Sequence, residues 1–223
     1  MFPFFKDNSI ESLRGKNITL VAELRPQIKI LIIDDEPFTH LDKIRQHRFN
    51  PTHITDLEAI ELAKDYHIIL CDIQGVGKKF ESPFEGAHII GELNKYYPTK
   101  VIIGYTGSHF HAGYNKYFSL CDDMVKKDID SDEWVEKLDF AIRCCIDPVY
   151  QWKKIHKILV DKDVSSKKIV AIEKNFVKHF NNRGTLFPLP ALANELPPDV
   201  KTILLNISSS AIFQIGSSIV ASV

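Results

Sequence analysis

Cysteine is scarce in this chain, and its few thiols follow no metal-binding or disulfide pattern. The 223 residues include 4 cysteines, without a C-x-x-C pair or a Cys/His spacing typical of zinc sites. We therefore expect reduced, structural thiols and no metal site built on sulfur. The residues concerned are Cys71, Cys121, Cys144 and Cys145.

A targeting segment and a clean membrane span are missing as well. Residues 1–5 (MFPFF) give way to polar sequence without a basic segment and a sustained apolar run, so we expect no signal peptide and a cytoplasmic location. None of the 21 residues 203–223 is charged, but Asn206, Gln214 and several Ser and Gly positions dilute this run. We expect it to pack on this chain or on a partner rather than to enter a membrane.

Net charge is nearly absent, at −1, and by itself points to no partner. Its distribution is uneven, because residues 1–150 carry 18 Lys+Arg and 24 Asp+Glu, giving −6, whereas residues 151–223 carry 10 and 5, giving +5. Basic solvated helices are commoner than nucleic-acid surfaces, and no helix-turn-helix or zinc-finger pattern is present. We therefore expect a protein partner or a homodimer through the C-terminal region, and do not favour nucleic acid.

The sequence does contain a clear alternation of strand-like and helix-like segments from residue 28 to about 146. Short β-branched apolar runs alternate with segments of helical length, which predicts an α/β fold with a doubly wound, five-stranded parallel sheet. The expected strands are 28–33, 51–54, 67–71, 100–105 and 122–126. The expected helices are 38–47, 56–64, 86–96, about 109–119, and 131–145 with Ser131 as N-cap.

The Asp147-Pro148 step predicts a domain boundary, because proline biases the residue before it away from helical geometry. We expect an N-terminal extension over 1–27, with a short extra strand at 18–21, and a sheet domain over 28–147. A small, mainly helical C-terminal region should follow over 148–223. Its expected helices are 149–160 and 166–182, followed by a proline-rich connector at 187–198.

Five polar residues stand where the predicted strands end. Asp34 and Asp35 follow the first strand, Asp72 the third, Thr106 the fourth and Lys127 the fifth. Ligands of doubly wound sheets bind beyond the carboxyl ends of the strands, so these side chains should converge. Carboxylate oxygens are ligands that Mg²⁺ prefers. The pattern indicates a metal site that handles phosphate.

In this order the five residues resemble the receiver domain of two-component response regulators. The resemblance implies a flavodoxin-like (CheY-like) fold and a histidine kinase or phosphotransfer protein that phosphorylates Asp72 in a Mg²⁺-dependent reaction. It also implies output through the C-terminal region, and no enzymatic activity beyond self-phosphorylation and self-dephosphorylation. The matching stretches are 30–37, 69–73, 86–98, 101–107 and 122–127.

The resemblance also assigns a metal site. It implies that Asp35 binds Mg²⁺ directly, that Asp34 does so directly or through water, and that Asp72 is both ligand and phosphoacceptor. The backbone carbonyl of Gln74 completes the set. A cation is needed because the carboxylate and the incoming phosphoryl group would otherwise repel each other.

Thr106 and Lys127 take the remaining roles by the same resemblance. Thr106 would hydrogen-bond a phosphoryl oxygen, and Lys127 would pair with Asp72 before transfer and with phosphate afterwards. Lys126 is the competing lysine, but Lys127 matches the family's spacing without a gap. Met124 then stands where the family usually has an aromatic residue, and Asp128 where it usually has proline.

Two other functions remain open on the sequence alone. The unusual Met124 and a loop at 74–85, about six residues longer than usual, fit a degenerate receiver that docks partners without phosphorylation. A haloacid dehalogenase-like phosphatase would need Asp-x-Asp after the first strand, where Asp34-Asp35-Glu36 offers Glu36 instead. Tyr105, His109, His111 and Cys71 lie close to the expected site, and the sequence gives none of them a role.

Overall fold

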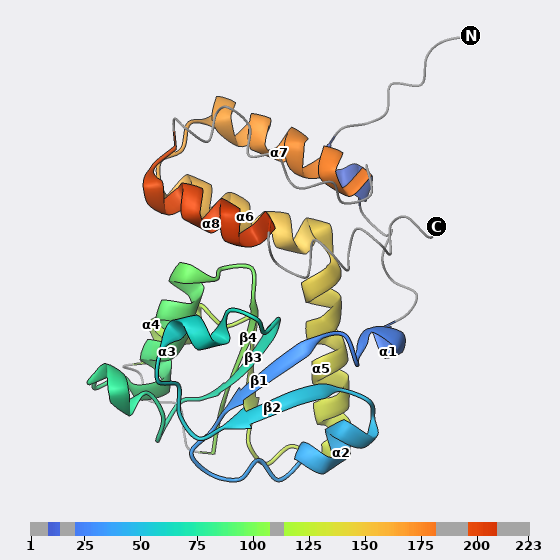
Figure 1. Ribbon diagram of the computed structural model, residues 1–223, viewed down its shortest axis with the longest axis vertical. Helices are drawn as coiled ribbons and strands as arrows, with labels where there is room; N and C mark the ends of the chain where they lie inside the picture. Colours follow the sequence, from blue (N-terminus) through green and yellow to red (C-terminus); the bar gives the residue numbers. More distant parts are fainter. Residues whose placement is uncertain (1–8, 14–20, 108–113, 182–195, 209–223) are drawn as a thin grey trace. The chain divides into compact units, whose positions relative to one another are not determined.

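The computed structural model describes residues 9–13, 21–107, 114–181 and 196–208 (Figure 1). These residues divide into two compact units. One unit is Leu20–Cys145, and the other combines Met1–Thr19 with Ile146–Val223. The domain limits expected from the sequence stay a prediction.

The first unit is built on one parallel sheet with the strand order β2-β1-β3-β4-β5. This is the flavodoxin-like order of doubly wound folds, so the predicted fold class is confirmed. Every strand begins and ends within one residue of its predicted limits. The strands are β1 Lys29–Ile33, β2 Asn50–Ile54, β3 Ile68–Asp72, β4 Val101–Thr106 and β5 Asp123–Lys126.

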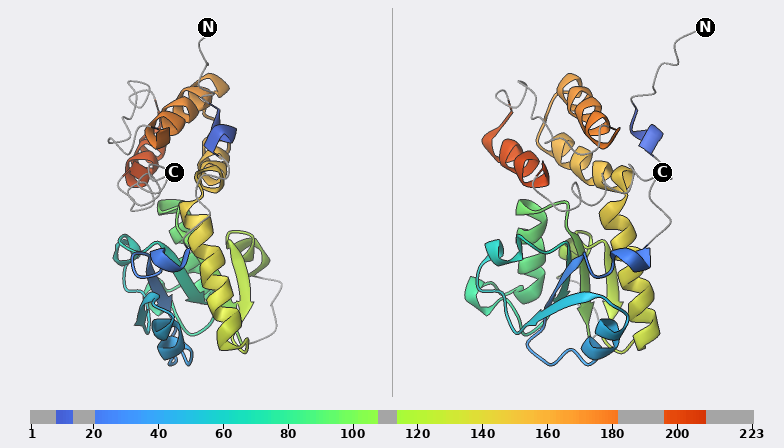
Figure 2. Two further views of the ribbon diagram at one scale, coloured as in Figure 1. Left: turned by 90° about the vertical axis from the view of Figure 1, so that its right-hand side faces the viewer. Right: turned by 45° about the vertical axis from the view of Figure 1, so that its right-hand side comes forward.

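The central strands read as continuous apolar runs because both faces of the sheet are covered. All residues of β3 and β4 are buried. On one face, α3 (Glu85–Tyr96) packs Ile89, Ile90 and Leu93 against the sheet. On the other, α5 (Ser131–Ile146) brings the buried Trp134 edge-on to Tyr105 of β4. Figure 2 shows α3 and α5 on opposite faces.

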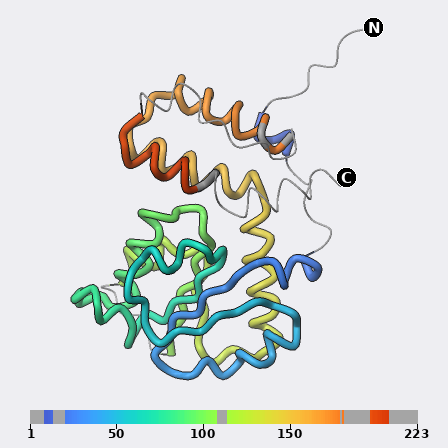
Figure 3. The backbone as a smooth tube through the Cα atoms, in the orientation of Figure 1, coloured from blue at the N-terminus to red at the C-terminus, as the bar shows by residue number. Residues whose placement is uncertain are grey.

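The connections between strands depart from the predicted helices in two places. The helix expected at 56–64 is wrong: the chain forms only the 3₁₀ turn η2 (Ile60–Ala63), and the Asp56 carboxylate instead accepts the backbone N–H groups of Gly77 and Lys78. The helix expected at 38–47 is shorter, because α2 covers only Leu41–Gln46. The chain between strands can be followed in Figure 3.

Other predicted elements lie partly outside the described residues. Of the expected helix at about 109–119, residues 109–113 lie outside them and α4 covers Asn115–Phe118. The strand expected at 18–21 lies outside them except for Val21, which begins the short helix α1 (Val21–Leu24) instead. The last remaining short helix of this unit is η3 (Lys78–Phe80).

The start of α5 is capped by a different residue from the one predicted. The helix begins at Ser131, but the Asp130 carboxylate accepts the N–H of Glu133 at 2.8 Å. Asp130 therefore supplies the N-cap oxygen. The Ser131 hydroxyl lies 2.9 Å from Nδ1 of His40, so it joins α5 to the segment after β1.

The second unit is helical, as expected for residues after Pro148. Its helices are α6 Pro148–Asp161, α7 Ser166–Asn181 and α8 Pro198–Ser208. Asp147 caps α6 by accepting the N–H of Val149 at 2.8 Å. The core is centred on Trp152, Phe176 and Phe180, whose neighbouring rings lie 5.3 and 4.9 Å apart.

Residues near the N-terminus belong to this helical core, which the sequence did not predict. In η1 (Ile10–Leu13), Leu13 is buried among the apolar side chains of α6, α7 and α8. The backbone N–H of Ile10 donates to Glu173 of α7 at 3.4 Å. Among the helices described here, none has the length and hydropathy to cross a bilayer.

Candidate functional site

Three carboxylates gather at the carboxyl ends of β1 and β3. Asp34, Asp35 and Asp72 each offer an oxygen, and these oxygens all lie within 4.8 Å of one another. The adjacent pairing of β1 and β3 brings them together. Asp34 and Asp72 are only 3% and 4% exposed, whereas Asp35 is exposed. Three hard oxygen donors at this spacing fit a divalent cation such as Mg²⁺.

Lys127 places its ammonium group among these acids. Its Nζ lies 2.7 Å from Asp72 Oδ2, 3.2 Å from Asp34 Oδ1 and 3.8 Å from Glu36 Oε2. Burial disfavours the charged lysine, yet the hydrogen bonds and charges of Asp72 and Asp34 outweigh it and raise the pKa of Lys127 above its ordinary value. The neighbouring Lys126 is exposed at the end of β5. Of the two lysines, Lys127 is therefore the one that reaches the acids.

The carboxyl group of Asp72 is buried, and this burial affects its pKa. Burial raises its pKa above the usual range, and the Lys127 hydrogen bond and the backbone N–H of Gln74 act in the opposite direction. The Gln74 N–H donates to Asp72 Oδ1 at 3.2 Å. The structure thus brings the backbone of Gln74 to Asp72, while the metal-binding role of its carbonyl stays a prediction.

Thr106 ends β4, next to the end of β5. It is buried, is paired in register with Lys126, and its carbonyl accepts the N–H of Lys127 at 3.1 Å. The strand pairing therefore brings Thr106 and Lys127 side by side, as expected from the sequence. The role of the Thr106 hydroxyl toward phosphate stays a prediction.

Tyr105 contacts the site although the sequence gave it no role. Its hydroxyl donates to Asp34 Oδ2 at 2.8 Å, and its side chain is 1% exposed. Burial, with the nearby Asp34 charge, raises the pKa of Tyr105, so the hydroxyl stays protonated as a donor. The one signal in the sequence was a polar-tipped side chain within the otherwise apolar run of β4. His109 and His111 lie outside the described residues.

The long loop after β3 is fixed at several points by acidic side chains. Glu85 accepts the N–H of Gly75 at 2.9 Å, and Asp56 accepts that of Gly77. Gly75 has φ +80°, and a Cβ there would lie 2.3 Å from Asp35 Oδ1. The loop also brings Lys78 Nζ within 3.6 Å of Asp35 Oδ2. The inserted residues therefore add a cation beside the exposed acid.

Two glycines permit close approaches near the site. A Cβ on Gly86 would lie 1.8 Å from the carbonyl oxygen of Asp72, so α3 can begin against the end of β3 only without a side chain there. A Cβ on Gly104 would lie 2.5 Å from Met124 Sδ and 3.1 Å from Cys121 Sγ. Met124 thus occupies the space over β4 that a side chain at position 104 would fill.

Cys71, the residue before Asp72 in β3, faces the core rather than the acid cluster. Cys71 is fully buried in the α3 side of the core, and its Sγ donates to the carbonyl oxygens of Asp72 and Gly86. Burial raises the pKa of the Cys71 thiol well above its ordinary value. All four cysteines are free thiols.

The fold and site define a doubly wound sheet with an acid cluster and a lysine at the strand ends. No protein-family model matches the chain, and comparison with curated proteins finds no significant match. Several solved structures with similarity to it are response regulators or their receiver domains. One, from Methanospirillum hungatei JF-1, shares 18% identity with a TM-score of 0.42, covering 52% of this chain and 93% of its own.

Two further solved structures match a similar share of this chain. A response regulator protein from Thermotoga maritima in complex with Mg(2+)-BeF shares 21% identity, with a TM-score of 0.39 and coverage of 51% and 98%. A BeF3-activated N-terminal receiver domain from Klebsiella pneumoniae shares 16%, with a TM-score of 0.44 and coverage of 52% and 98%. We take the fold from the strand order and register described above.

Proposed function

We propose that this chain is a response regulator-like signalling protein that accepts a phosphoryl group on Asp72. The observation that carries this proposal is the 2.7 Å contact of Lys127 Nζ with Asp72, inside a cluster of three carboxylates. A buried acid with one lysine and two further acids has the parts that an acyl-phosphate site needs. The donor would be a histidine kinase or a phosphotransfer protein.

The reaction would move the phosphoryl group from a donor nitrogen to an Asp72 oxygen. The nitrogen–phosphorus bond breaks, an oxygen–phosphorus bond forms, and the donor imidazole keeps the bonding electron pair. Mg²⁺, held by Asp34, Asp35, Asp72 and the Gln74 carbonyl, would neutralise charge on the transferring group. The protein's own contribution is to hold these oxygens together at the strand ends.

Lys127 and Thr106 would act on the phosphoryl oxygens. Before transfer, Lys127 is paired with Asp72 at 2.7 Å and with Asp34 at 3.2 Å. An added phosphoryl group would draw the ammonium toward its own oxygens, because it carries more negative charge than the carboxylate did. Thr106, at the neighbouring strand end, would donate its hydroxyl to another of these oxygens.

The geometry gives less support to a phosphatase with Asp34 as nucleophile. Both Asp34 oxygens already accept hydrogen bonds: Oδ2 from Tyr105, and Oδ1 from Lys127 and from the N–H of Glu36. A nucleophilic oxygen so engaged would lose these bonds as it attacked. Asp72 accepts hydrogen bonds from the Gln74 N–H at Oδ1 and from Lys127 at Oδ2, and Lys127 would move with the phosphoryl group after transfer to Asp72.

A receiver that docks partners without phosphorylation is the second candidate. It is favoured by Met124, which takes the place of the family's usual aromatic residue and lies against Gly104. In that case the acid cluster would be structural. The C-terminal helical unit would be the output region in either case.

Intact mass after incubation with acetyl phosphate and Mg²⁺ separates the two candidates. We expect the wild-type chain to gain one phosphoryl unit, and Asp72→Ala to gain none. Asp42→Asn, which changes an exposed acid of α2, is the matched control and should gain the unit as the wild type does. No gain by the wild type at any Mg²⁺ concentration would favour the docking module.

A further inference from the structure

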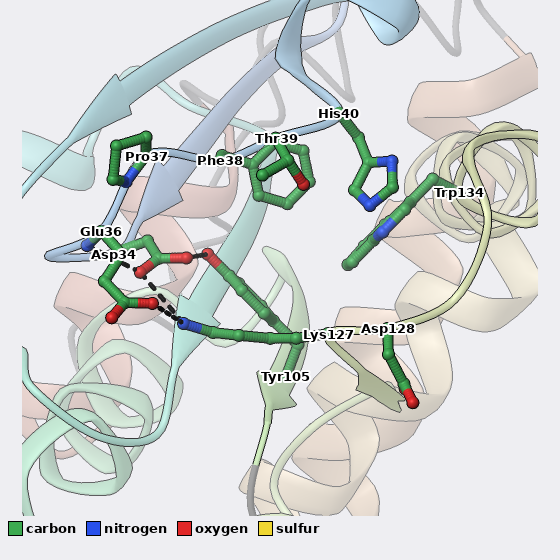
Figure 4. Close-up of a pocket in the computed structure, with 10 residues that line it drawn as sticks. All are labelled: Asp34, Glu36, Pro37, Phe38, Thr39, His40, Tyr105, Lys127, Asp128 and Trp134. Carbon is green, nitrogen blue, oxygen red and sulfur yellow. Dashed lines mark hydrogen bonds and ion pairs between the residues drawn. The ribbon is translucent and has the colours of Figure 1, made fainter.

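A cavity opens beside the acid cluster and shares part of its lining with it. Its volume is about 260 Å³, and Asp35, Asp72 and Thr106 do not line it. Four of the residues described above at the acid cluster also line the cavity: Asp34, Glu36, Tyr105 and Lys127. Figure 4 shows its lining side chains, which come from the segment after β1, from β4, from the end of β5 and from α5.

The inner part of this cavity is aromatic. Phe38, Tyr105 and Trp134 are 8%, 1% and 0% exposed. Their rings meet edge to face, with centroids 5.2 Å apart for Phe38 and Trp134, 6.0 Å for Phe38 and Tyr105, and 5.7 Å for Tyr105 and Trp134. Aromatic walls in this arrangement favour a flat ring, which can continue the edge-to-face packing.

One donor in this aromatic part has no acceptor among the described residues. The Nε1–H of Trp134 is buried and makes no hydrogen bond within the described part of the chain. The neighbouring polar groups do have hydrogen-bond partners: the Tyr105 hydroxyl donates to Asp34, and His40 Nδ1 is paired with the Ser131 hydroxyl. Leaving a buried N–H unpaired costs about 1–3 kcal/mol. Figure 4 shows the indole extending from α5 into the space between His40 and Lys127.

The charges around the opening disfavour an anion. Glu36 and Asp128 are exposed there, and Asp34 lies deeper. The cation that lines the cavity, Lys127, is already paired with Asp34 and Asp72. A carboxylate or phosphate would therefore meet uncompensated acids, whereas a neutral group with N–H donors would find acceptors.

We propose that this cavity binds a small, uncharged aromatic molecule whose carbonyl oxygen accepts the Trp134 Nε1–H. Because this N–H is fully buried, the surrounding side chains must shift slightly when the molecule binds. An aromatic carboxamide has the required parts: a flat ring for the aromatic walls, one acceptor for the indole, and N–H donors for the acids at the opening. The proposal does not rest on phosphorylation of Asp72, because Asp72 does not line the cavity.

Benzamide is the probe, and the indole N–H signals of the ¹⁵N-labelled full-length chain are the readout. The chain has 2 tryptophans, Trp134 here and Trp152 in the helical unit, so each chain gives two indole signals. Trp134→Phe assigns them, and Trp152→Phe does so independently if the first variant fails to fold. We expect benzamide to move the Trp134 signal saturably and to leave the Trp152 signal in place.

Two matched molecules test the proposed chemistry. Cyclohexanecarboxamide keeps the amide without the flat ring, and benzoate keeps the ring but carries a negative charge. Each should bind at least about fivefold more weakly than benzamide. Cyclohexanecarboxamide lacks the ring that packs against the aromatic walls, and the acids at the opening repel benzoate. Equal binding of all three, equal movement of both indole signals, or no movement at about 20 mM benzamide overturns the proposal.

Discussion

The hydroxyl of Tyr105 donates a 2.8 Å hydrogen bond to Asp34, joining the fourth strand to the acid cluster at the end of the first. This bond occupies the Asp34 oxygen that Lys127 does not contact. Tyr105 therefore fixes the carboxylate from the sheet side while the lysine fixes it from the site side. An acid held in this way keeps its orientation when Lys127 moves.

We expect Tyr105→Phe to leave the Asp34 carboxylate less well oriented, without creating a cavity in the core. Because the buried carboxylate loses a donor, we expect the free energy of unfolding to fall by about 1–3 kcal/mol. Mg²⁺ affinity should also fall, since one of the three carboxylates is less well oriented. Urea denaturation and a metal titration measure these effects. The control is Tyr96→Phe, at an exposed ring of α3, for which both quantities should stay unchanged.

His67 should make the protein lose stability in mild acid. Burial lowers the pKa of His67 from 6.5 to about 4, and its Nδ1 accepts the N–H of Lys29 at 2.9 Å. The unfolded chain therefore binds the proton more readily than the folded chain, and stability falls as pH drops from about 6.5 through about 4. The full loss for this group is about 3 kcal/mol.

The variant His67→Gln tests this pH dependence. The glutamine cannot take up the proton, so the stability difference between pH 7 and pH 4 should shrink relative to the wild type. His156→Gln, at an exposed position of α6, should leave it unchanged. If His67→Gln and the wild type lost the same stability over this pH range, His67 would not be the group that titrates.

Gly86→Ala should destabilise the junction between β3 and α3. The added Cβ would lie 1.8 Å from the Asp72 carbonyl oxygen, so the helix start must shift away from the strand end. We expect a cost of about 1–3 kcal/mol, the usual range for overpacking, together with slower phosphorylation. Gly107→Ala, whose Cβ would meet Lys127 Cδ at an ordinary 3.7 Å, should be close to neutral in thermal unfolding.

Lys78→Met should strengthen Mg²⁺ binding. The Lys78 ammonium lies 3.6 Å from Asp35 Oδ2 and competes with a cation for the exposed acid. Because the pair is exposed, we expect a gain of only about twofold to fivefold in affinity, and a smaller gain at high salt. Lys79→Met is the matched control for the loss of one charge from the same turn. Equal gains in both variants would show a general charge effect.

The sheet and the convergence of the site residues could be predicted from the sequence because both depend on short-range patterns. Buried parallel strands must be apolar throughout, and polar residues at their ends must meet at one edge. Asp34, Asp72 and Lys127 stood at such ends. The ion pair of Lys127 with Asp72 shows which of the two adjacent lysines faces the acids.

Long-range contacts could not be predicted in this way. The helix expected at 56–64 is replaced by a 3₁₀ turn, while Asp56 holds a loop about 20 residues away in sequence. The contact of Tyr105 with Asp34 joins residues 71 positions apart. Likewise Leu13 packs in a core formed by the C-terminal helices. None of these partners leaves a local pattern in the chain.

The position of the phosphoryl group tests the central proposal most directly. After incubation with acetyl phosphate and Mg²⁺, borohydride reduction converts an aspartyl phosphate to homoserine, and peptide mass spectrometry then locates it. The account predicts homoserine at position 72, with positions 34 and 35 unchanged. Homoserine at position 34, or at neither position in a folded, Mg²⁺-saturated chain, would contradict it.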